Sequence, residues 1–411
     1  MVCLADFALQ MGVREMSYGD APNQIDRFFE SKLPWSRIKD EILTKYVDAF
    51  LRTVPSLNKD VVIVDAFAGP GRFGDGHPGS PAILMSAASA LLQRKSSRVT
   101  LLVADERPAH RESLRREFRS EIASGVCMDP FESWQDAVAR ALDSPAGTTL
   151  LIYLDPFGIR DLPFSDIRAI YERDKSQCTD VILNLSSKTL KRMIGNLDPV
   201  DADETAGKVK LSKIRTVSRF MDCSDWIRIA SDRSLATTDR ETRLVELYTS
   251  RVRRLQSLSH AVPIFDDRLG VGEIPGDQAA KYFLILATRH IRAVRYFNDI
   301  ALRALSPYFQ GFTEGMLFPV TPTRFVKAEE DRVASSILSL VRQRGELARD
   351  AICDQLAPLY FLQYSSTEIR HIVDGLYAKG MLAVAKGSLG STGRLNARSI
   401  LTSAGNGEQD E

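Results

Sequence analysis

The sequence has few cysteines, and their arrangement suits neither a metal site nor a disulfide framework. Its 411 residues include 5 cysteines, none of which forms a C-x-x-C pair. The 5 histidines are far apart, and neither H-E-x-x-H nor a His/Cys spacing typical of zinc ligands occurs. We therefore expect reduced thiols, no metal site and a cytoplasmic location.

Long apolar runs and an excess of one charge are also missing. No apolar stretch reaches the roughly 18 residues of a membrane span, and the N-terminus lacks the pattern of a signal peptide. The 54 basic and 53 acidic side chains give a formal net charge of +1. This balance neither indicates nor excludes a polyanionic partner, so any nucleic-acid surface would have to be a local patch.

Alternating strand and helix patterns predict an α/β fold with a parallel sheet. A helical pattern over 36–54 comes first, with apolar residues at Ile38, Ile42, Leu43, Tyr46, Val47 and Phe50. Short apolar, β-branched runs then predict strands within residues 60–69, 98–106, 148–158, 179–187 and 281–290. Helical patterns lie between them, including an arginine-rich stretch after the second run.

After about residue 328 the alternation stops. Three helical patterns and a hairpin with a Gly/Ser turn follow, which is the order of a winged helix. The expected organisation is an N-terminal arm at 1–30, a Rossmann-like domain at 31–325 with a helical insertion at about 188–260, a winged-helix-like domain at 326–405, and a disordered tail at 406–411.

The first strand is followed by a G-x-G-x-x-G pattern at Gly69, Gly71 and Gly74. A dinucleotide-binding loop turns directly from strand into helix, whereas here Ser80 and Pro81 predict the helix start some 14 residues after Asp65. A dehydrogenase is therefore disfavoured. No Gly-Lys-Ser/Thr follows, which excludes a P-loop, and no G-x-S-x-G elbow of a hydrolase occurs.

S-adenosylmethionine fits a glycine loop flanked by carboxylates at strand ends. Asp65 would face its ammonium group, Asp105 with Glu106 its ribose hydroxyls, and Asp129 its adenine amino group, because ionised carboxylates only accept hydrogen bonds. The predicted cofactor site comprises Asp65, Phe67, Gly69, Gly71, Asp105, Glu106 and Asp129. Each Asp alone is equally compatible with a strand end or helix cap, so the prediction depends on the series.

A second motif, Asp155, Pro156, Phe157 and Gly158, ends the strand within 148–158. Amino-group methyltransferases often have Asp/Asn-Pro-Pro-Tyr/Phe here, where polar groups accept from the target amino group and the ring stacks on the base. This sequence lacks the second proline, and its ring comes one residue early. These four residues are the predicted reaction site, acting by positioning. Asn184, at the next strand end, would line the same crevice or form a strand-end turn.

Both motifs belong to an ordered series that resembles the three-Cys-motif partner proteins. The matching stretches are "KDEILTKYVDAFL", "VDAFAGPGRFG" followed by "GSP", "VADERP", "YLDPFG", "VILNL" and "YFLILATRHIRAVRYFNDI". They cover roughly residues 30–305 of this chain. The resemblance implies a bacterial protein with a methyltransferase-type core, and a cysteine-cluster enzyme of the radical type as its partner. It leaves the substrate open.

Arginines at helical spacing could form a basic surface. Arg289 and Arg292 leave the last predicted core strand close to aromatic residues, and Arg370 lies near the start of the predicted recognition helix. These residue types suit phosphate contact and base stacking, although solvated helix faces look the same. The winged-helix-like domain is as compatible with protein docking as with nucleic acid.

The sequence therefore predicts an S-adenosylmethionine-dependent methyltransferase acting on an amino group of a nucleic acid or nucleotide. The alternative is a non-catalytic Rossmann-like scaffold that supports a cysteine-cluster enzyme. No metal is needed for methyl transfer to nitrogen.

Overall fold

A computed structural model describes residues 29–32, 34–53, 59–92, 98–160, 162–174, 177–195, 204–255, 258–265, 280–313, 327–385, 388–390 and 394–403. Residues 1–28 of the predicted arm and the predicted tail at 406–411 lie outside this set. None of the helices within these residues is long and apolar enough to cross a membrane.

A six-stranded sheet in the order β2-β1-β3-β4-β6-β5 forms the centre of the larger unit. The strands are β1 (Val61–Asp65), β2 (Val99–Val103), β3 (Thr149–Leu154), β4 (Thr179–Ser186), β5 (Leu258–Ile264) and β6 (Tyr282–Thr288). Strands β1 to β4 are parallel, whereas β6 is antiparallel to both of its neighbours. The mostly parallel α/β sheet confirms the predicted fold class.

The far edge of the sheet departs from the prediction in two ways. The expected last strand, β6, is antiparallel to both of its neighbours, β4 and β5. Strand β5 itself was not predicted; its sequence "LSHAVPI" contains serine, histidine and proline, which weaken a strand signal. This reversed edge also differs from the dinucleotide-binding sheet, whose strands are classically parallel.

At the opposite edge, the segment around Asp129 runs beside β2 without forming a regular strand. Cys127 and Phe131 make isolated parallel bridges to Leu101 and Ala104. The segment therefore extends the sheet beyond β2 as an irregular seventh element.

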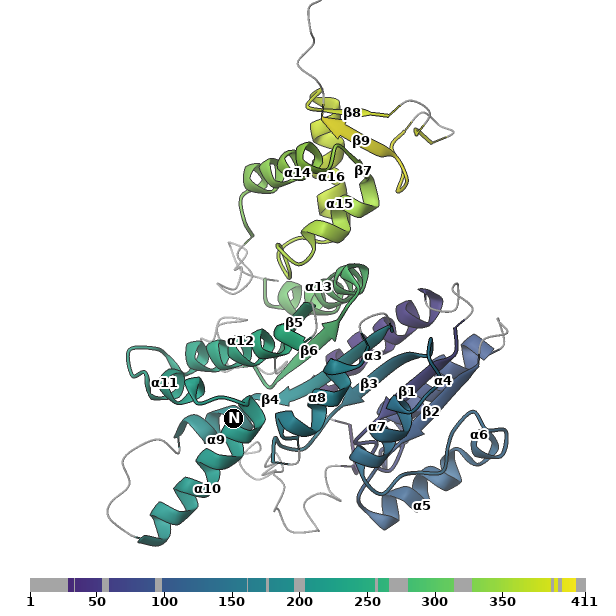
Figure 1. Cartoon of the computed structure of the whole chain (residues 1–411), viewed down its shortest axis with the longest axis vertical. Coiled ribbons are helices and arrows are strands. Elements are labelled where there is room, and N and C mark those ends of the chain that lie inside the picture. Colours follow the sequence, from purple (N-terminus) through teal and green to yellow (C-terminus); the bar gives the residue numbers. More distant parts are fainter. Residues whose placement is uncertain are drawn as a thin grey trace, which may run out of the picture.

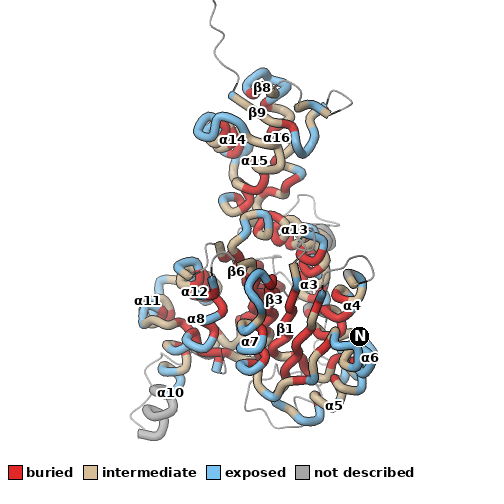
Figure 2. Tube along the Cα trace, turned by 45° about the vertical axis from the view of Figure 1, so that its right-hand side comes forward, coloured by how far each residue is buried: buried red, intermediate tan, exposed pale blue. Residues whose placement is uncertain are grey.

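Helices cover both faces of the sheet (Figure 1). One face carries α3 (Pro34–Thr53), α4 (Ser80–Leu92) and α13 (Ile291–Thr313), and α3 contacts both of the others. The other carries α7 (Trp134–Leu142), α8 (Phe164–Glu172) and α12 (Thr237–Leu255), with α9 (Ser187–Gly195), α10 (Glu204–Met221) and α11 (Asp225–Ser231) packed around α8 and α12. Helices α5 (Pro108–Glu117) and α6 (Arg119–Ala123) follow β2 and contact each other. Between these layers, β1 and β3 are buried along their whole length (Figure 2). The apolar residues predicted on α3 from Ile42 to Phe50 are buried.

The C-terminal unit contains α14 (Glu330–Arg344), β7 (Glu346–Ala348), α15 (Arg349–Leu356), α16 (Ser366–Ala378), β8 (Leu382–Val384) and β9 (Ile400–Ser403). Its strands form a three-stranded antiparallel sheet in the order β7-β9-β8, and it has a core of its own. The three helices and the hairpin match the predicted patterns, while β7 was not foreseen. The assignment to the winged-helix class stays a prediction.

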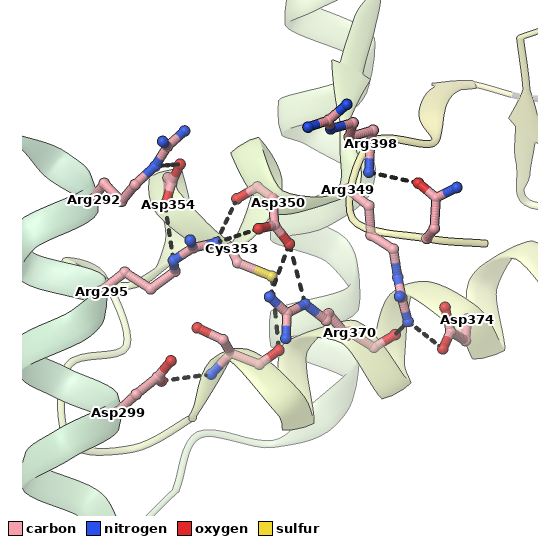
Figure 3. Close-up of polar contacts among 12 residues, drawn as sticks. Arg292, Arg295, Asp299, Arg349, Asp350, Cys353, Asp354, Arg370, Asp374 and Arg398 are labelled. Atoms are coloured by element: carbon pink, nitrogen blue, oxygen red, sulfur yellow. Dashed lines mark hydrogen bonds and ion pairs between the residues drawn. The ribbon is translucent and has the colours of Figure 1, made fainter. Parts of the chain in front are cut away.

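A polar network joins this unit to α13 (Figure 3). Arg295 of α13, with a side chain 5% exposed, lies 3.2 Å from Asp350 and 3.0 Å from Asp354. Arg370 pairs with Asp350 at 2.8 Å, and Arg292 lies 3.4 Å from Asp354. These arginines bind carboxylates within the protein, in an interface between the two units.

Hydrogen bonds and ring contacts fix the same interface. The Ser366 amide, in the first turn of α16, donates to Asp299 of α13 at 2.8 Å. Asn298 accepts from the Leu362 amide at 2.6 Å and donates to the Tyr364 carbonyl at 2.8 Å. The start of α16 therefore faces α13.

Replacing Arg295 with Met should destabilise the protein by roughly 3 kcal/mol, because it leaves two partly buried carboxylates with one arginine each. Urea unfolding of the variant and wild type measures the change in free energy of unfolding. Arg303→Met, on the exposed side of the same helix, is the matched control and should change it by less than about 0.5 kcal/mol. Equal effects of the two substitutions would show that the network contributes no docking energy.

Candidate functional site

Two neighbouring pockets open at the carboxyl ends of the parallel strands, where α/β sheets bind ligands. The smaller has a cavity of about 90 Å³, and the larger one of about 410 Å³. Phe67 and Phe157 line both pockets, so their rings form a shared boundary. Only the larger cavity falls in the range of roughly 300–1,000 Å³ common for small-molecule sites.

Asp155, just after β3, is the polar centre of the smaller pocket. Its Oδ2 lies 2.5 Å from Nζ of Lys39 and accepts from the Tyr153 hydroxyl at 3.0 Å. Its Oδ1 accepts from Nδ2 of Asn184 at 2.7 Å. A carboxylate offers about four lone-pair positions, so roughly one remains for a ligand.

The ion pair is largely shielded from solvent, with side chains 13% exposed at Lys39 and 21% at Asp155. Burial by itself lowers the pKa of Lys39, but the surrounding acidic groups, of which Asp155 contributes most, together outweigh burial and raise that pKa well above its ordinary value. Burial, with the charge of Asp155, also raises the pKa of Tyr153 well above its ordinary value. Lys39 is therefore a cation and Tyr153 a neutral donor at neutral pH.

Asp65, the last residue of β1, is completely buried. Its Oδ1 accepts weakly from the Phe67 amide at 3.4 Å, and its Oδ2 has no hydrogen-bond partner among the described residues. Burial raises its pKa to about 7; the Ser80 hydroxyl opposes this, and the charge of Asp155 adds to it. Such a carboxyl can either hold a proton or meet a cation near neutral pH.

The glycine loop folds back on itself before α4 begins at Ser80, which confirms that no helix follows the fingerprint directly. Gly69 and Gly71 have φ values of 61° and 93°, which favour glycine. The Gly69 amide donates to Oδ2 of Asp105 at 3.0 Å. A Cβ on Gly69 would lie 2.9 Å from the ring of Phe29, so at this position the loop approaches a side chain of the protein.

Asp105 and Glu106, after β2, line the larger pocket with Trp134. Asp105 also accepts from the Arg107 amide at 2.9 Å and lies 3.1 Å from Nδ1 of His110. With the bond from the glycine loop, Asp105 therefore organises the loop and keeps about one lone-pair position for a ligand.

The structure brings together most of the predicted site residues but not all. Pro156, Phe157 and Asn184 line the smaller pocket with Asp155, whereas Gly158 and the predicted cofactor residues Asp65 and Gly69 line neither pocket. Asp129 also lines neither; its side chain is 62% exposed and pairs with Arg115 at 2.8 Å.

The predicted basic residues lie away from both pockets. Arg289, after the end of β6, binds the backbone carbonyls of Tyr171, Arg173, Asp174 and Gln177. Because β6 is antiparallel to β4, this is the amino end of the parallel strands, opposite the pockets. Arg292 and Arg370 lie in the interface with the C-terminal unit.

Several pocket residues were missed by the sequence analysis. They are Phe29, Lys39, Trp134 and Tyr282; Tyr153, also missed, lies behind the smaller pocket and donates to Asp155. Lys39 had a detectable signal, because it lies three and four residues before Ile42 and Leu43, on the apolar face of α3. The other missed residues gave no such signal, because aromatic residues at strand and helix ends also occur for packing alone and so do not indicate a site.

No known protein-family model matches the sequence, and no curated protein matches it. One solved structure with a similar chain path is the plantazolicin methyltransferase BamL in complex with a triazolic desmethylPZN analog and SAH. It is 9% identical with a TM-score of 0.30, covering 66% of this chain and 91% of that chain. Another is a possible exported protein from Bordetella parapertussis, 16% identical with a TM-score of 0.30, covering 69% and 78% of the two chains. Likenesses at this level add nothing to the argument from the site.

Asp65 predicts a specific pH dependence of stability. Its folded-state pKa of about 7 lies above the ordinary 3.8, so between these values the folded protein holds a proton that the unfolded chain has lost. The free energy of unfolding therefore falls as pH rises through this window. Asp65→Asn removes this pH-dependent contribution. The free energy of unfolding of the variant should therefore rise by roughly 2–3 kcal/mol relative to that of wild type between pH 5 and pH 8.

Urea unfolding of both proteins at the two pH values measures this difference. Asp129→Asn, at an exposed ion pair, is the control for general effects of removing a carboxylate. A difference between Asp65→Asn and wild type that stays constant with pH would contradict the raised pKa.

Proposed function

We propose that this chain is an S-adenosylmethionine-dependent methyltransferase that acts on an amino nitrogen. The supporting observation is the pairing of a cofactor-sized pocket, edged by the carboxylates after β2, with a smaller pocket centred on Asp155. The two meet at Phe67 and Phe157. A cofactor in one pocket and an acceptor in the other would thus be neighbours, which is what positioning catalysis requires.

The residues around the larger pocket fit this cofactor. Asp105 and Glu106 can accept from ribose hydroxyls, and Trp134 offers a ring to the adenine. Asp65 is completely buried and lines neither pocket, so we assign it no contact with the ammonium group of the cofactor. When bound, S-adenosylmethionine supplies an electrophilic methyl group on a sulfonium.

The residues of the smaller pocket can hold a neutral amino group. Asp155 can accept one N–H, which orients the nitrogen lone pair away from the carboxylate. Lys39 is protonated and cannot act as a base, so an acceptor that is already neutral at pH 7 suits the site best. Amino groups on heteroaromatic rings meet this condition, whereas aliphatic ammonium groups do not.

One observation favours the alternative, a cofactor-binding scaffold for a cysteine-cluster partner enzyme. Asp155 already receives three hydrogen bonds or ion-pair contacts from the protein, as a purely structural carboxylate would. The partner is implied by sequence resemblance alone. Binding of S-adenosylmethionine is common to both functions, and only transfer separates them.

Calorimetric titration with S-adenosylmethionine and, separately, NAD tests the cofactor that the proposal requires. We expect binding of the methyl donor alone, weakened at least about tenfold by Asp105→Asn, since this carboxylate aligns both the loop and the ribose. Asp129→Asn, outside both pockets, should change the affinity by less than about twofold. Thermal unfolding checks that each variant is folded.

Two results would contradict the proposal. One is the absence of S-adenosylmethionine binding to folded wild-type protein. The other is tighter binding of NAD than of the methyl donor.

A further inference from the structure

Lys39 and Asp155 place a donor and an acceptor side by side in the smaller pocket. Their Nζ and Oδ2 atoms are 2.5 Å apart, and both residues line the cavity. The complement of such a pair is a ligand edge with an acceptor next to a donor. An amino group beside a ring nitrogen, as on the edge of a nucleic-acid base, has this pattern.

Asn184 adds a second acceptor beside Asp155. The residue is 2% exposed, and its Nδ2 already donates to Asp155. Its Oδ1 is buried without a hydrogen-bond partner among the described residues. Since buried polar atoms are rarely left unpaired, this oxygen indicates a missing donor, such as the second N–H of an amino group.

The charges of the pocket disfavour an anionic ligand. Within the described residues, the lining cations are Lys39, paired with Asp155, and Arg72, paired with Glu117 at 2.5 Å. The lining carboxylate Asp40 pairs with Lys32 at 2.5 Å. Because each lining charge is already paired, the pocket offers an anion no uncompensated cation, whereas a neutral ring needs none.

The walls and the volume favour one flat ring. Five aromatic side chains line the pocket, namely Phe29, Phe67, Phe73, Phe157 and Tyr282. The rings of Phe29 and Phe157 meet edge to face at 6.0 Å. The cavity of about 90 Å³ is small, which suits a single six-membered ring better than a fused pair.

We propose that the smaller pocket recognises the amino edge of a neutral pyrimidine of the cytosine type. Lys39 donates to the ring nitrogen, and Asp155 and Asn184 accept from the exocyclic amino group. Lys39 is thus a specificity-determining residue, absent from the predicted motif. The assignment rests on the proposed function only in taking this ring as the methyl acceptor; its recognition requires no cofactor.

Free cytosine and uracil are matched probes, since they have nearly the same size and opposite patterns at this edge. Ligand-observed NMR titration of the wild-type protein, without cofactor, measures both dissociation constants. We expect cytosine to bind at least about tenfold more tightly than uracil, because uracil faces Asp155 with a carbonyl oxygen. Equal binding, or binding of neither base, overturns the proposal without any variant.

Substitutions at Lys39 then test its role. Lys39→Met should weaken cytosine binding about tenfold, and Lys39→Arg, which keeps a cationic donor, should restore part of it. Lys45→Met, on the exposed side of α3, should have no effect. If the folded Lys39→Met variant has the same dissociation constant for cytosine as wild type, Lys39 does not recognise the ring.

Asp155→Asn tests whether the hydrogen-bond acceptor at this position determines the preference for cytosine. The amide can present either an oxygen or an NH₂ group, so the preference for cytosine over uracil should fall toward parity. An unchanged preference would contradict the proposed contact. Because S-adenosylmethionine binding is measured separately in the larger pocket, failure of either proposal leaves the other open to its own test.

Discussion

The ion pair between Lys39 and Asp155 is the interaction on which the site depends. It links α3, at the start of the described core, to the end of the central strand β3, 116 residues later. A pair so poorly exposed is stable only when hydrogen bonds compensate for lost hydration. Tyr153 and Asn184 supply them. The same contacts fix the carboxylate in one orientation, with one side toward the cavity.

A second buried contact holds α3 farther along its length. The Tyr46 hydroxyl donates to Asp180 of β4 at 2.7 Å, and Thr288 of β6 donates to the same carboxylate at 2.6 Å. Burial raises the pKa of Asp180 despite these donors. With both contacts, α3 cannot rotate or slide without breaking a buried polar interaction. The wall of the smaller pocket that α3 provides is therefore preorganised, which lowers the entropic cost of binding.

The sequence predicted what depends on local pattern. Strands β1 to β4, the start of α4 at Ser80 and the polar groups at strand ends follow from residue types and spacing over a few positions. The residues that complete the site come from far away in the chain. Nothing near Lys39 indicates that it faces Asp155, because only the folded sheet brings them together.

The arginines also show that local sequence patterns do not predict tertiary contacts. Arg292 and Arg370 were predicted as a nucleic-acid surface, yet Arg292 pairs with Asp354 across the interface between the units, and Arg370 pairs with Asp350 within the C-terminal unit. An arginine that will bind phosphate and one that will bind a carboxylate of the same chain look alike in sequence. Strand β5 was missed for a related reason, since pairing with β6 outweighs its weak intrinsic preference.

A double-mutant cycle on Lys39→Met and Asp155→Asn tests the central interaction most directly. The free energy of unfolding in urea is measured for wild type, both single variants and the double variant. If the pair organises the site, the double variant should be less destabilised than the sum of the single ones, by on the order of 2 kcal/mol. Additivity within about 0.5 kcal/mol would mean that the two side chains act independently. That result would contradict the claim that the ion pair preorganises the smaller pocket, and with it the proposed recognition of the pyrimidine.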